Sequence, residues 1–266
     1  MEPFRVHILG CGSALPTLKH NSSAQVVEVR GKLFLVDCGE GTQVLLRRSR
    51  ISFTKIQAVF ISHLHGDHCF GLDFEVVFHA VDTTRHQPIY SDRSLVVESI
   101  PLEHRIPCCG FLFREKPLLP HIRRDMIDAY EIPVSHINNI KNGADWTMPD
   151  GTLVPNSRLT KPADPPRSYA YCSDTRYIPT LHQLLKNVSL LYHESTYSQE
   201  QADRAAQYWH STAHEAALVA RDAGVGCLML GHYSARYEDE EKLLNEARKV
   251  FENTCLSDEG MVFDVK

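Results

Sequence analysis

The stretch Ala58-Val59-Phe60-Ile61-Ser62-His63-Leu64-His65-Gly66-Asp67-His68 decides how this chain is expected to fold. Its apolar part predicts a β-strand over Ala58–Ser62, which leads directly into three histidines and an aspartate. These side chains cannot all point the same way from a strand, but a sharp turn at Gly66 lets them converge. Neutral imidazole and carboxylate are ligands that Zn²⁺ and similar ions take in catalytic sites. The stretch therefore predicts a metal site at the end of a strand.

Further metal donors follow other apolar runs. His104, Asp174 and His232 each lie just beyond a predicted strand. In open sheets, sites are built at the edge that such strand ends form. Any one of these histidines alone is more often an ordinary surface residue, but chance explains the whole group poorly. Together with the loop His63–His68, they supply enough donors for two metal ions.

Short apolar runs and helical patterns indicate a mixed α/β (α+β) chain in which helices cover sheets. The predicted strands are Arg5–Leu9, Val26–Val29, Leu33–Val36, Ala58–Ser62, Leu95–Ile100, Gly110–Phe113, Tyr169–Ser173, Leu190–His193, Cys227–Gly231 and Met261–Val265. The predicted helices are Gly41–Arg48, Pro179–Leu185, Gln199–Tyr208, Thr212–Ala223 and Glu238–Phe251. Thr212 and Glu215 form a predicted capping box, and Gly224 is placed to end that helix. A single domain is expected over residues 1–266.

The formal net charge of −5 argues against a protein that coats nucleic acid by bulk charge, although a local basic patch could still grip phosphates. No apolar run is long enough to cross a bilayer, and the N-terminus has no basic start followed by an apolar stretch. The eight cysteines show no C-x-x-C pair and no compact framework. Reduced thiols, a cytoplasmic location and no membrane contact are therefore predicted.

Several segments resemble, in order, those of the ribonuclease Z branch of the metallo-β-lactamase superfamily, whose general signature is H-x-H-x-D-H. The matching segments are Leu9–Pro16, Asp37–Gln43, Ser62–Leu72, His193–Thr196, His210–Thr212 and Gly231–Tyr237. The last three are far more specific than the metal signature. The resemblance covers nearly the whole chain. It implies a four-layer αββα sandwich with a protruding arm, in a zinc endoribonuclease that removes the 3′ trailer from precursor tRNA.

The same resemblance implies two Zn²⁺ ions per subunit. The implied ligands are His63, His65 and His104 for one ion, Asp67, His68 and His232 for the other, and Asp174 for both. Asp37 resembles a residue that braces the histidine loop. Its alternative role is that of a turn-former after a strand.

The implied reaction is attack of hydroxide on the scissile phosphorus, which leaves a 3′-hydroxyl on the tRNA and a 5′-phosphate on the trailer. Asp67 can accept the nucleophile's proton, while His210 stabilises the pentacovalent state or protonates the departing oxygen. Glu194 would hold His210 in its charged form. The implied phosphate-binding residues are Arg236, Ser211 and Thr212. Without the resemblance, His210 could be a surface residue, and Glu194 and Arg236 a structural pair.

Residues Arg114 to Arg167 contain scattered prolines and show little pattern of regular structure. Such a stretch is either a surface excursion or a functional element. By resemblance, residues from about 114 to 158 form an arm that binds the tRNA body. Its basic residues are Arg123, Arg124, Lys141 and Arg158. In the resembled family, the arm of one subunit serves the active site of the other, which implies a twofold homodimer.

The chain departs from the family pattern after Leu72. The family continues with a helix and a further strand, whereas this chain passes directly to Asp73. The missing region adds in that family to the dimer face and to the pocket for the tRNA end. Either the chain carries a true deletion, or the printed residues join two parts of a longer chain. The second explanation is preferred, because a deletion would uncover the core beside His68 in a marginally stable domain.

Two other functions are considered. The chain could hydrolyse a small ester, thioester or lactam, but the segments around His210 and Arg236 argue against this. It could instead be a non-catalytic metal- or RNA-binding scaffold, which would fit a pocket broken at the Leu72–Asp73 junction. The complete set of seven ligands argues against a dead site.

Overall fold

The computed structural model of the protein describes residues 2–14, 16–72 and 77–266. The chain divides into two compact units. Unit 1 comprises Met1–Glu115 and Arg167–Lys266, and it contains all the predicted ligands and catalytic residues. Unit 2 comprises Lys116–Pro166. Among the described residues, no helix is both long and apolar enough to span a membrane, and all eight cysteines are free.

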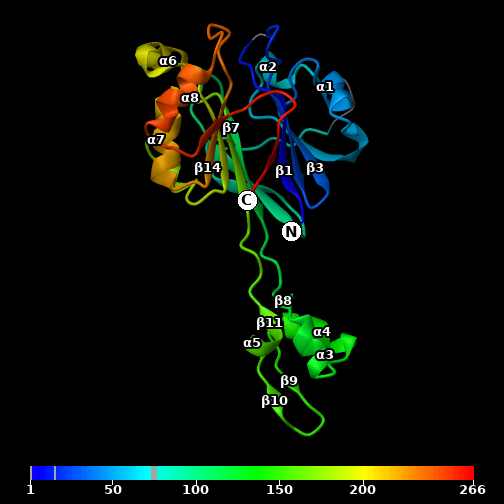
Figure 1. The fold of residues 1–266 in the computed structure, drawn as a ribbon. Coiled ribbons are helices and arrows are strands. Elements are labelled where there is room, and N and C mark those ends of the chain that lie inside the picture. Colours follow the sequence, from blue (N-terminus) through cyan, green and yellow to red (C-terminus); the bar gives the residue numbers. More distant parts are fainter. Residues whose placement is uncertain (1, 15, 73–76) are drawn as a thin grey trace. The chain divides into compact units, whose positions relative to one another are not determined.

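Unit 1 is built on two β-sheets (Figure 1). The first has strand order β16-β1-β2-β3-β4, and only its β3 and β4 pair in parallel. Its strands are β1 (Phe4–Gly10), β2 (Ala24–Val29), β3 (Lys32–Val36), β4 (Ile56–Phe60) and β16 (Val262–Asp264). The second has order β15-β14-β13-β12-β7-β6-β5, in which β12 to β15 are parallel. Its strands are β5 (Gln87–Ser91), β6 (Leu95–Pro101), β7 (Cys109–Glu115), β12 (Ser168–Cys172), β13 (Leu190–Glu194), β14 (Cys227–Gly231) and β15 (Thr254–Leu256).

Alternating side chains explain why the first sheet is covered on both faces. Phe34 and Val36 of β3 join the large core that also contains buried residues of the second sheet. Leu35 lies between them in sequence and points to the opposite face. There it packs in a separate core with Leu45 of α1 (Thr42–Arg48). One strand thus supplies two apolar layers.

The second sheet is covered by α7 (Ala213–Ala223) and α8 (Glu241–Arg248), which pack against each other (Figure 1). α7 also packs on β13 and β14, and α8 packs on β15. The buried face of α7 is rich in small side chains, including Ala216, Ala217 and Ala220. With α1 against the first sheet, the order of layers is αββα. The predicted fold is confirmed.

Most predicted elements are present with shifted ends. β14 has the predicted bounds, and α7 has the predicted capping box, with Gly224 ending the helix at φ 63°. The predicted helix Pro179–Leu185 is wrong, because only a 3-10 turn, Leu181–Gln183, forms there. The predicted helix Gln199–Tyr208 is split into a 3-10 turn, Gln199–Gln201, and α6 (Ala202–Tyr208). The short helix α2 (Gly66–Cys69) within the histidine loop and the strands β5 and β15 were not predicted.

Unit 2 corrects the expectation of little regular structure between Arg114 and Arg167. It contains α3 (Arg124–Ala129), α4 (Val134–Lys141), α5 (Asn156–Leu159) and two small sheets, β8 (His121–Ile122) with β11 (Thr160–Lys161) and β9 (Trp146–Thr147) with β10 (Leu153–Val154). Its own core contains Ile127, Ile132, Ile140, Val154 and Leu159. Elements this short do not show a hydrophobic period, which explains why the sequence pattern missed them.

Candidate metal centre

The predicted ligands lie where strands of both sheets end. The loop His63–His68 follows β4 of the first sheet. His104 follows β6, Asp174 follows β12 and His232 follows β14 of the second sheet. The two sheets therefore bring residues that are far apart in sequence to one edge of unit 1.

Asp174 lies at the centre of this group. Its Oδ2 atom lies 3.1 Å from His68 Nε2 and 3.2 Å from His232 Nε2. Its Oδ1 atom lies 3.8 Å from His104 Nε2 and 3.9 Å from His63 Nε2. Two of the groups whose donor atoms lie within 4.8 Å of one another are His63, His65 and His104, and Asp67, His68 and His232. Overlapping groups of the same kind are His63, His68 and Asp174, and His104, Asp174 and His210. The first two groups are the sets assigned to two ions from the sequence, with the aspartate facing both.

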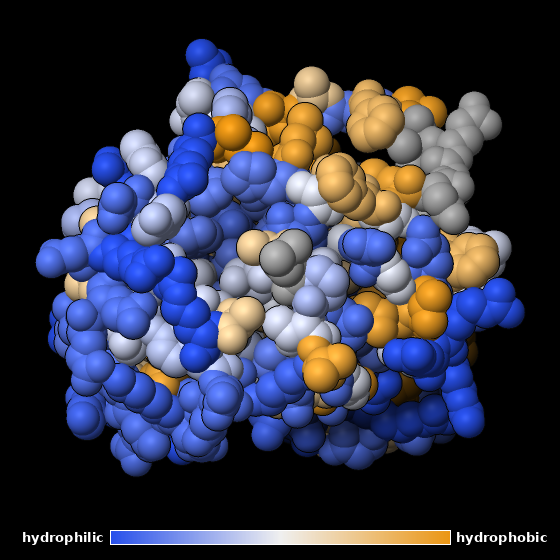
Figure 2. Space-filling model, turned by 90° about the horizontal axis from the view of Figure 1, so that it is seen from above, coloured by the Kyte–Doolittle hydropathy of each residue, from blue (hydrophilic) through white to orange (hydrophobic). Residues whose placement is uncertain are grey.

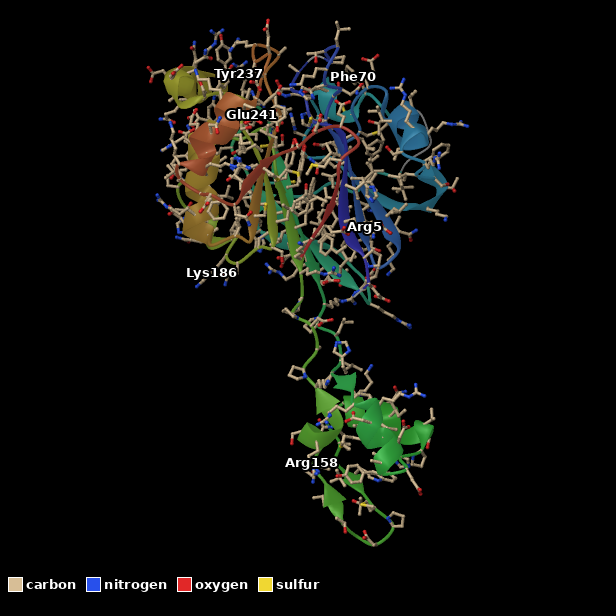
Figure 3. The ribbon with its side chains drawn as sticks, viewed as in Figure 1. Arg5, Phe70, Arg158, Lys186, Tyr237 and Glu241 are labelled. Carbon is tan, nitrogen blue, oxygen red and sulfur yellow. The ribbon has the colours of Figure 1, made fainter. Side chains whose placement is uncertain are left out.

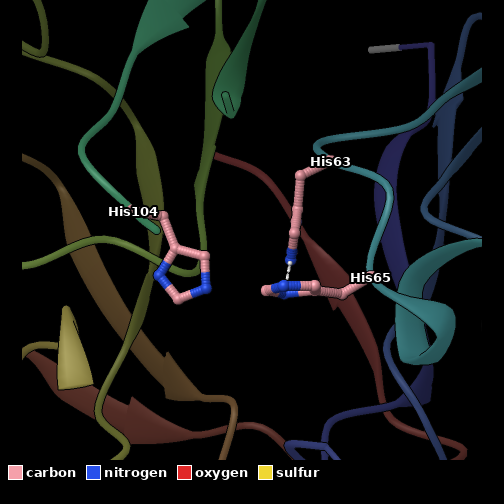
Figure 4. A group of neighbouring side chains, drawn as sticks. All are labelled: His63, His65 and His104. Atoms are coloured by element: carbon pink, nitrogen blue, oxygen red, sulfur yellow. Dashed lines mark hydrogen bonds between the residues drawn. The ribbon is translucent and has the colours of Figure 1, made fainter. Parts of the chain in front are cut away.

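The histidines His63, His65 and His104 converge from two sides of the site (Figure 4). His63 and His65 come from the loop after β4, and His104 comes from the segment after β6. His63 Nε2 lies 2.9 Å from His65 Nδ1, and the ring centroids of His65 and His104 are 5.2 Å apart. Three ring nitrogens thus gather where one cation could bind them.

In His68, His104 and His232, the ring nitrogen Nδ1 contacts an oxygen atom of another residue. The Nδ1 atom of His68 lies 2.6 Å from Asp37 Oδ2, that of His104 3.0 Å from the carbonyl oxygen of Trp209, and that of His232 2.9 Å from Thr196 Oγ1. Histidines that bind metals are usually oriented in this way through their other nitrogen. The Nε2 atoms of His68 and His232 are buried and have no hydrogen bond of normal geometry, although Asp174 lies near both. Buried nitrogens without partners fit a site that binds metal.

Burial controls the charge of several of these groups. It lowers the pKa of His63 to about 4 and also lowers the pKa values of His104 and His232, which favours the neutral form that binds metal. Burial alone would raise the pKa of Asp174, but the neighbouring His232 and His68 hold it well below its usual range. Burial would likewise raise the pKa of Asp67, but the neighbouring imidazole of His68, whose Nε2 atom lies 3.4 Å from Asp67 Oδ2, lowers it to about 2. Both carboxylates are therefore ionised at neutral pH.

Three residues of the site have a left-handed backbone. The φ angles are 55° for Asp37, 55° for Asp174 and 57° for His232. Residues with a side chain adopt this conformation at a cost, which Asp tolerates better than His. Each residue stands at or just beyond the end of a strand, so the turn there changes the direction of the chain at the site. Strain of this kind tends to gather at functional sites.

Asp37 is fully buried and braces the histidine loop. Its carboxylate accepts hydrogen bonds from the Ser62 backbone N–H at 2.7 Å, the Ser62 hydroxyl at 2.9 Å and the Tyr171 hydroxyl at 2.7 Å. It also contacts His68 Nδ1. A role as a turn-former alone does not account for these contacts.

Glu194 and His210 form a second buried group beside the ligands. Glu194 Oε1 lies 2.9 Å from His210 Nδ1, and the ring centroids of His104 and His210 are 5.1 Å apart. Burial alone would lower the pKa of His210, but the carboxylate of Glu194 raises it to about 9. His210 is therefore charged at neutral pH. Glu194 and Arg236 were considered as a structural pair, but in the structure Glu194 pairs with His210.

The residues expected to bind phosphate differ in exposure. Arg236 is exposed, and its Cζ atom lies 5.4 Å from the centroid of the Tyr197 ring. Ser211 and Thr212 are buried. The Ser211 hydroxyl donates to the carbonyl oxygen of Thr175, and Thr212 caps α7. Phosphate binding by Ser211 and Thr212 stays a prediction, and the structure gives each a supporting role.

Some residues of the site could not be found from the sequence. Tyr171 lies within a fully buried strand, and nothing in that strand signals a partner for Asp37. Thr196 contacts both Glu194 and His232, and Trp209 orients His104 through its backbone oxygen. The contact of Trp209 uses only the main chain, so no side-chain pattern could reveal it.

The amino-acid sequence is similar over its full length to those of known proteins. The chain is 49% identical over 305 aligned positions to Ribonuclease Z of Phocaeicola vulgatus, covering 100% of this chain and 99% of that protein. It is 48% identical over 300 positions to Ribonuclease Z of Bacteroides fragilis, covering 98% and 99%. It is 42% identical over 304 positions to Ribonuclease Z of Porphyromonas gingivalis, covering both chains fully.

Solved structures show the same fold. Human tRNase Z, short form, superposes with a TM-score of 0.66 at 23% identity, covering 98% of this chain and 99% of that one. The metallo-β-lactamase fold protein YhfI of Bacillus subtilis gives a TM-score of 0.71 at 18% identity, covering 99% and 100%. Residues 4–99 also match the family described as anti-Pycsar protein Apyc1. Given its identity over the full length to the curated relatives, this chain belongs to the ribonuclease Z family.

Proposed function

We propose that this chain is an endoribonuclease that cleaves the 3′ trailer from precursor tRNA, leaving a 3′-hydroxyl on the tRNA and a 5′-phosphate on the trailer. Its relatives named Ribonuclease Z, at 41% to 49% identity, support this function. The observation that carries it is the position of Asp174 between two sets of metal donors, beside the ion pair of Glu194 and His210. This arrangement suits hydrolysis of a phosphodiester.

Two Zn²⁺ ions fit the donor set. His63, His65 and His104 would hold one ion, Asp67, His68 and His232 the other, and Asp174 both. Imidazole and carboxylate are common ligands of catalytic zinc, and the unpartnered Nε2 atoms of His68 and His232 support the assignment. When bound, such ions supply a nucleophile from water at neutral pH and offset charge on the phosphoryl oxygens.

The protein's own groups would manage protons and charge. The carboxylate of Asp67 is ionised and accepts a hydrogen bond from the Ala14 backbone N–H, so it can take the proton of the attacking water. His210 is charged, so it can stabilise the pentacovalent state or give its proton to the departing 3′-oxygen. Glu194 keeps that imidazole in place and charged.

Arg236 would bind the substrate phosphate. Among the described residues, no carboxylate lies within ion-pair distance of its guanidinium. The ring of Tyr197, which it covers, lies 6.1 Å from the ring of His210. A planar guanidinium in this position suits a phosphate oxygen pair. Ser211 and Thr212 would support this site through their hydrogen bonds.

We also propose that unit 2 contacts the body of the tRNA. Its basic residues Arg124 and Arg158 are exposed, and Arg158 is labelled in Figure 3. A surface that touches only phosphates needs few charges, and its affinity falls steeply with salt. The protein would act as a twofold homodimer. It would work in a reducing compartment such as the cytoplasm, because all eight cysteines are free.

We further propose that a segment of the family is absent at the junction of Leu72 and Asp73. The residues 73–76 lie outside the described part of the chain. Alignment to the Phocaeicola vulgatus relative extends over 305 positions, whereas this chain has 266 residues. Near the junction, Leu64, Phe70 and Phe78 are 76%, 75% and 76% exposed. An absent segment that normally covers these side chains would explain their exposure.

One of these side chains, Phe70, is labelled in Figure 3. Phe70 stands at the end of unit 1 that carries α2 (Figure 3). Hydrophobic side chains gather along one side of the face seen from that end (Figure 2). The intact mass of the protein from its natural source decides the matter. A mass near 30.2 kDa supports a true deletion, and a clearly larger mass supports two joined parts of a longer chain.

The proposed function is tested by incubating the protein with zinc and a 3′-extended tRNA, in parallel with small ester, thioester and lactam substrates. Cleavage of the tRNA at its 3′ end with little turnover of the small substrates is expected. The reverse result would favour a small-substrate hydrolase. Bound metal with no turnover of any substrate would favour a scaffold.

A further inference from the structure

We propose that an arginine–aromatic surface beside the metal centre binds the unpaired nucleotides that flank the scissile phosphate. The surface consists of Arg105, Arg176, Arg204, Tyr208 and Trp209. This inference rests on the proposed function and deepens it. It assigns contacts to the RNA bases, which metal ligands and a charged histidine do not provide.

The five residues form two groups with cation–aromatic contacts, one at the Trp209 ring and one at the Tyr208 ring. Arg176 Cζ lies 4.6 Å from the centroid of the Trp209 ring. Arg105 Cζ lies 4.9 Å, and Arg204 Cζ 5.6 Å, from the centroid of the Tyr208 ring. Tyr208 is the last residue of α6 and Trp209 follows it, so the two groups are adjacent along the chain. The three arginines are exposed and the two rings are partly exposed.

This surface adjoins the metal centre through two chain segments. Arg105 directly follows His104, and Trp209 directly precedes His210. The carbonyl oxygen of Trp209 lies 3.0 Å from His104 Nδ1. A phosphate held at the metal centre would therefore have its neighbouring nucleotides close to this surface. α6 lies at the same end of unit 1 as α2 (Figure 1).

The surface keeps a positive charge although the whole chain is acidic. Glu103 pairs with Arg176, whose Nε donates to it at 2.5 Å. Within the described residues, no carboxylate lies within ion-pair distance of Arg105 or Arg204. Two of the three guanidinium groups are thus available for phosphate oxygens.

The backbone of Trp209 is a second sign of function. Its φ angle is 60°, in the left-handed region, at the position where α6 ends. Glycine usually fills such a position, and a bulky residue there is strained. Unpaired bases stack on aromatic rings and on guanidinium planes, which gives binding that tolerates many sequences. Recognition of this type would serve trailers of different sequences.

Fluorescence of Trp209 tests the proposal without relying on turnover. In the full chain with Trp146→Phe, Trp209 is the remaining tryptophan of the two. We expect a single-stranded RNA to quench its emission, and an RNA of equal length without bases to quench it far less. Two further probes show from which side of the scissile phosphate the bound nucleotides come. One is a mature tRNA that ends at its unpaired 3′ base, and the other is a free trailer oligonucleotide. Equal, negligible quenching by all these RNAs would overturn the proposal, whether or not the protein cleaves precursor tRNA.

Cleavage kinetics provide the second test. Trp209→Ala should raise the KM for precursor tRNA about tenfold, the size of effect that loss of one stacked base gives. Trp209→Phe should recover most of the loss, and removing the stacked base from the substrate should abolish the difference between Trp209→Ala and wild type. Phe53→Ala and Arg221→Ala are matched controls, because both residues are exposed and lie on other elements. If Trp209→Ala matches Phe53→Ala in KM while metal content is unchanged, the surface does not bind RNA.

Discussion

Glu194 Oε1 lies 2.9 Å from His210 Nδ1, and both groups are shielded from solvent, with 0% and 16% of their side chains exposed. Glu194 also accepts hydrogen bonds from the backbone N–H groups of Thr175 and Ser211. These two hydrogen bonds fix the position of the carboxylate independently of its contact with the imidazole. This arrangement leaves the other ring nitrogen of His210 free to act in the site.

Replacing His210 with alanine should lower the cleavage rate about 10²- to 10⁴-fold, the usual contribution of a positioned acid. Metal content should stay the same, because the assigned ligands are untouched. Single-turnover cleavage and metal analysis of the same preparation measure both effects. His86→Ala, which alters a histidine just before β5, is the control. Loss of metal in His210→Ala would make His210 a ligand rather than an acid.

The pH dependence of cleavage should reveal the same pair. Glu194 raises the pKa of His210 to about 9, so the charged form persists at neutral pH and activity falls only as the pH passes that value. In Glu194→Gln the attraction is gone and burial lowers the pKa of His210, so activity should fall at lower pH. Single-turnover rates from pH 6 to 10 compare the two proteins. If the cleavage rates of the two proteins fall at the same pH, this role of Glu194 is excluded.

Asp37→Asn should weaken metal binding about 10- to 100-fold, the usual effect of losing a partner that orients a ligand. The amide cannot serve as acceptor for Ser62, Tyr171 and His68 together. Competition with a chelator measures the affinity. Asp92→Asn is the matched control, because Asp92 pairs with Lys32 outside the metal centre. Equal affinities for the two variants would mean that Asp37 does not brace the site.

The buried pair of Glu115 and Arg167 should stabilise unit 1 where its chain leaves for unit 2 and returns. Glu115→Gln should cost about 3 to 5 kcal/mol in free energy of unfolding, because it leaves a buried charge unpaired. Glu98→Gln, which breaks the more exposed pair with Arg114, should cost about 0 to 1 kcal/mol. Urea unfolding at neutral pH measures both, and similar losses would contradict the account.

Acid should remove the stabilisation that the pair of Glu115 and Arg167 gives to unit 1. Burial alone would raise the pKa of Glu115, but hydrogen bonds from Arg167 lower it below its ordinary value of 4.5. A lowered pKa means that the stabilisation is present above that value and is lost as the pH falls below it. Wild type should therefore lose stability relative to Glu115→Gln on acidification. A difference between them that does not change with pH would contradict this.

Many strands and helices could be predicted from local signals in the sequence, whereas the order of the layers came from the family resemblance. A short continuous apolar run marks β3, and the capping box at Thr212 marks the start of α7. The resemblance then grouped the ligands into two sets, which the structure brings together around Asp174. Local patterns and the resemblance thus covered the centre of the site.

What the sequence could not predict depends on contacts between distant residues. Tyr171 reaches Asp37 across the core, and the Trp209 carbonyl orients His104 through the main chain. The elements of unit 2 are held by a small core whose residues, such as Ile127 and Leu159, are too widely spaced to show a period. Only the folded chain reveals these relationships.

The terminal groups of the two products show which nucleophile attacks the scissile phosphate. Precursor tRNA is cleaved by the protein in the presence of zinc, and both fragments are examined for their terminal groups. We expect a cut at the 3′ end of the tRNA body, a 3′-hydroxyl on the tRNA and a 5′-phosphate on the trailer, because water is the nucleophile. A 2′,3′-cyclic phosphate with a 5′-hydroxyl would show that the RNA's own hydroxyl attacks, and it would contradict the account.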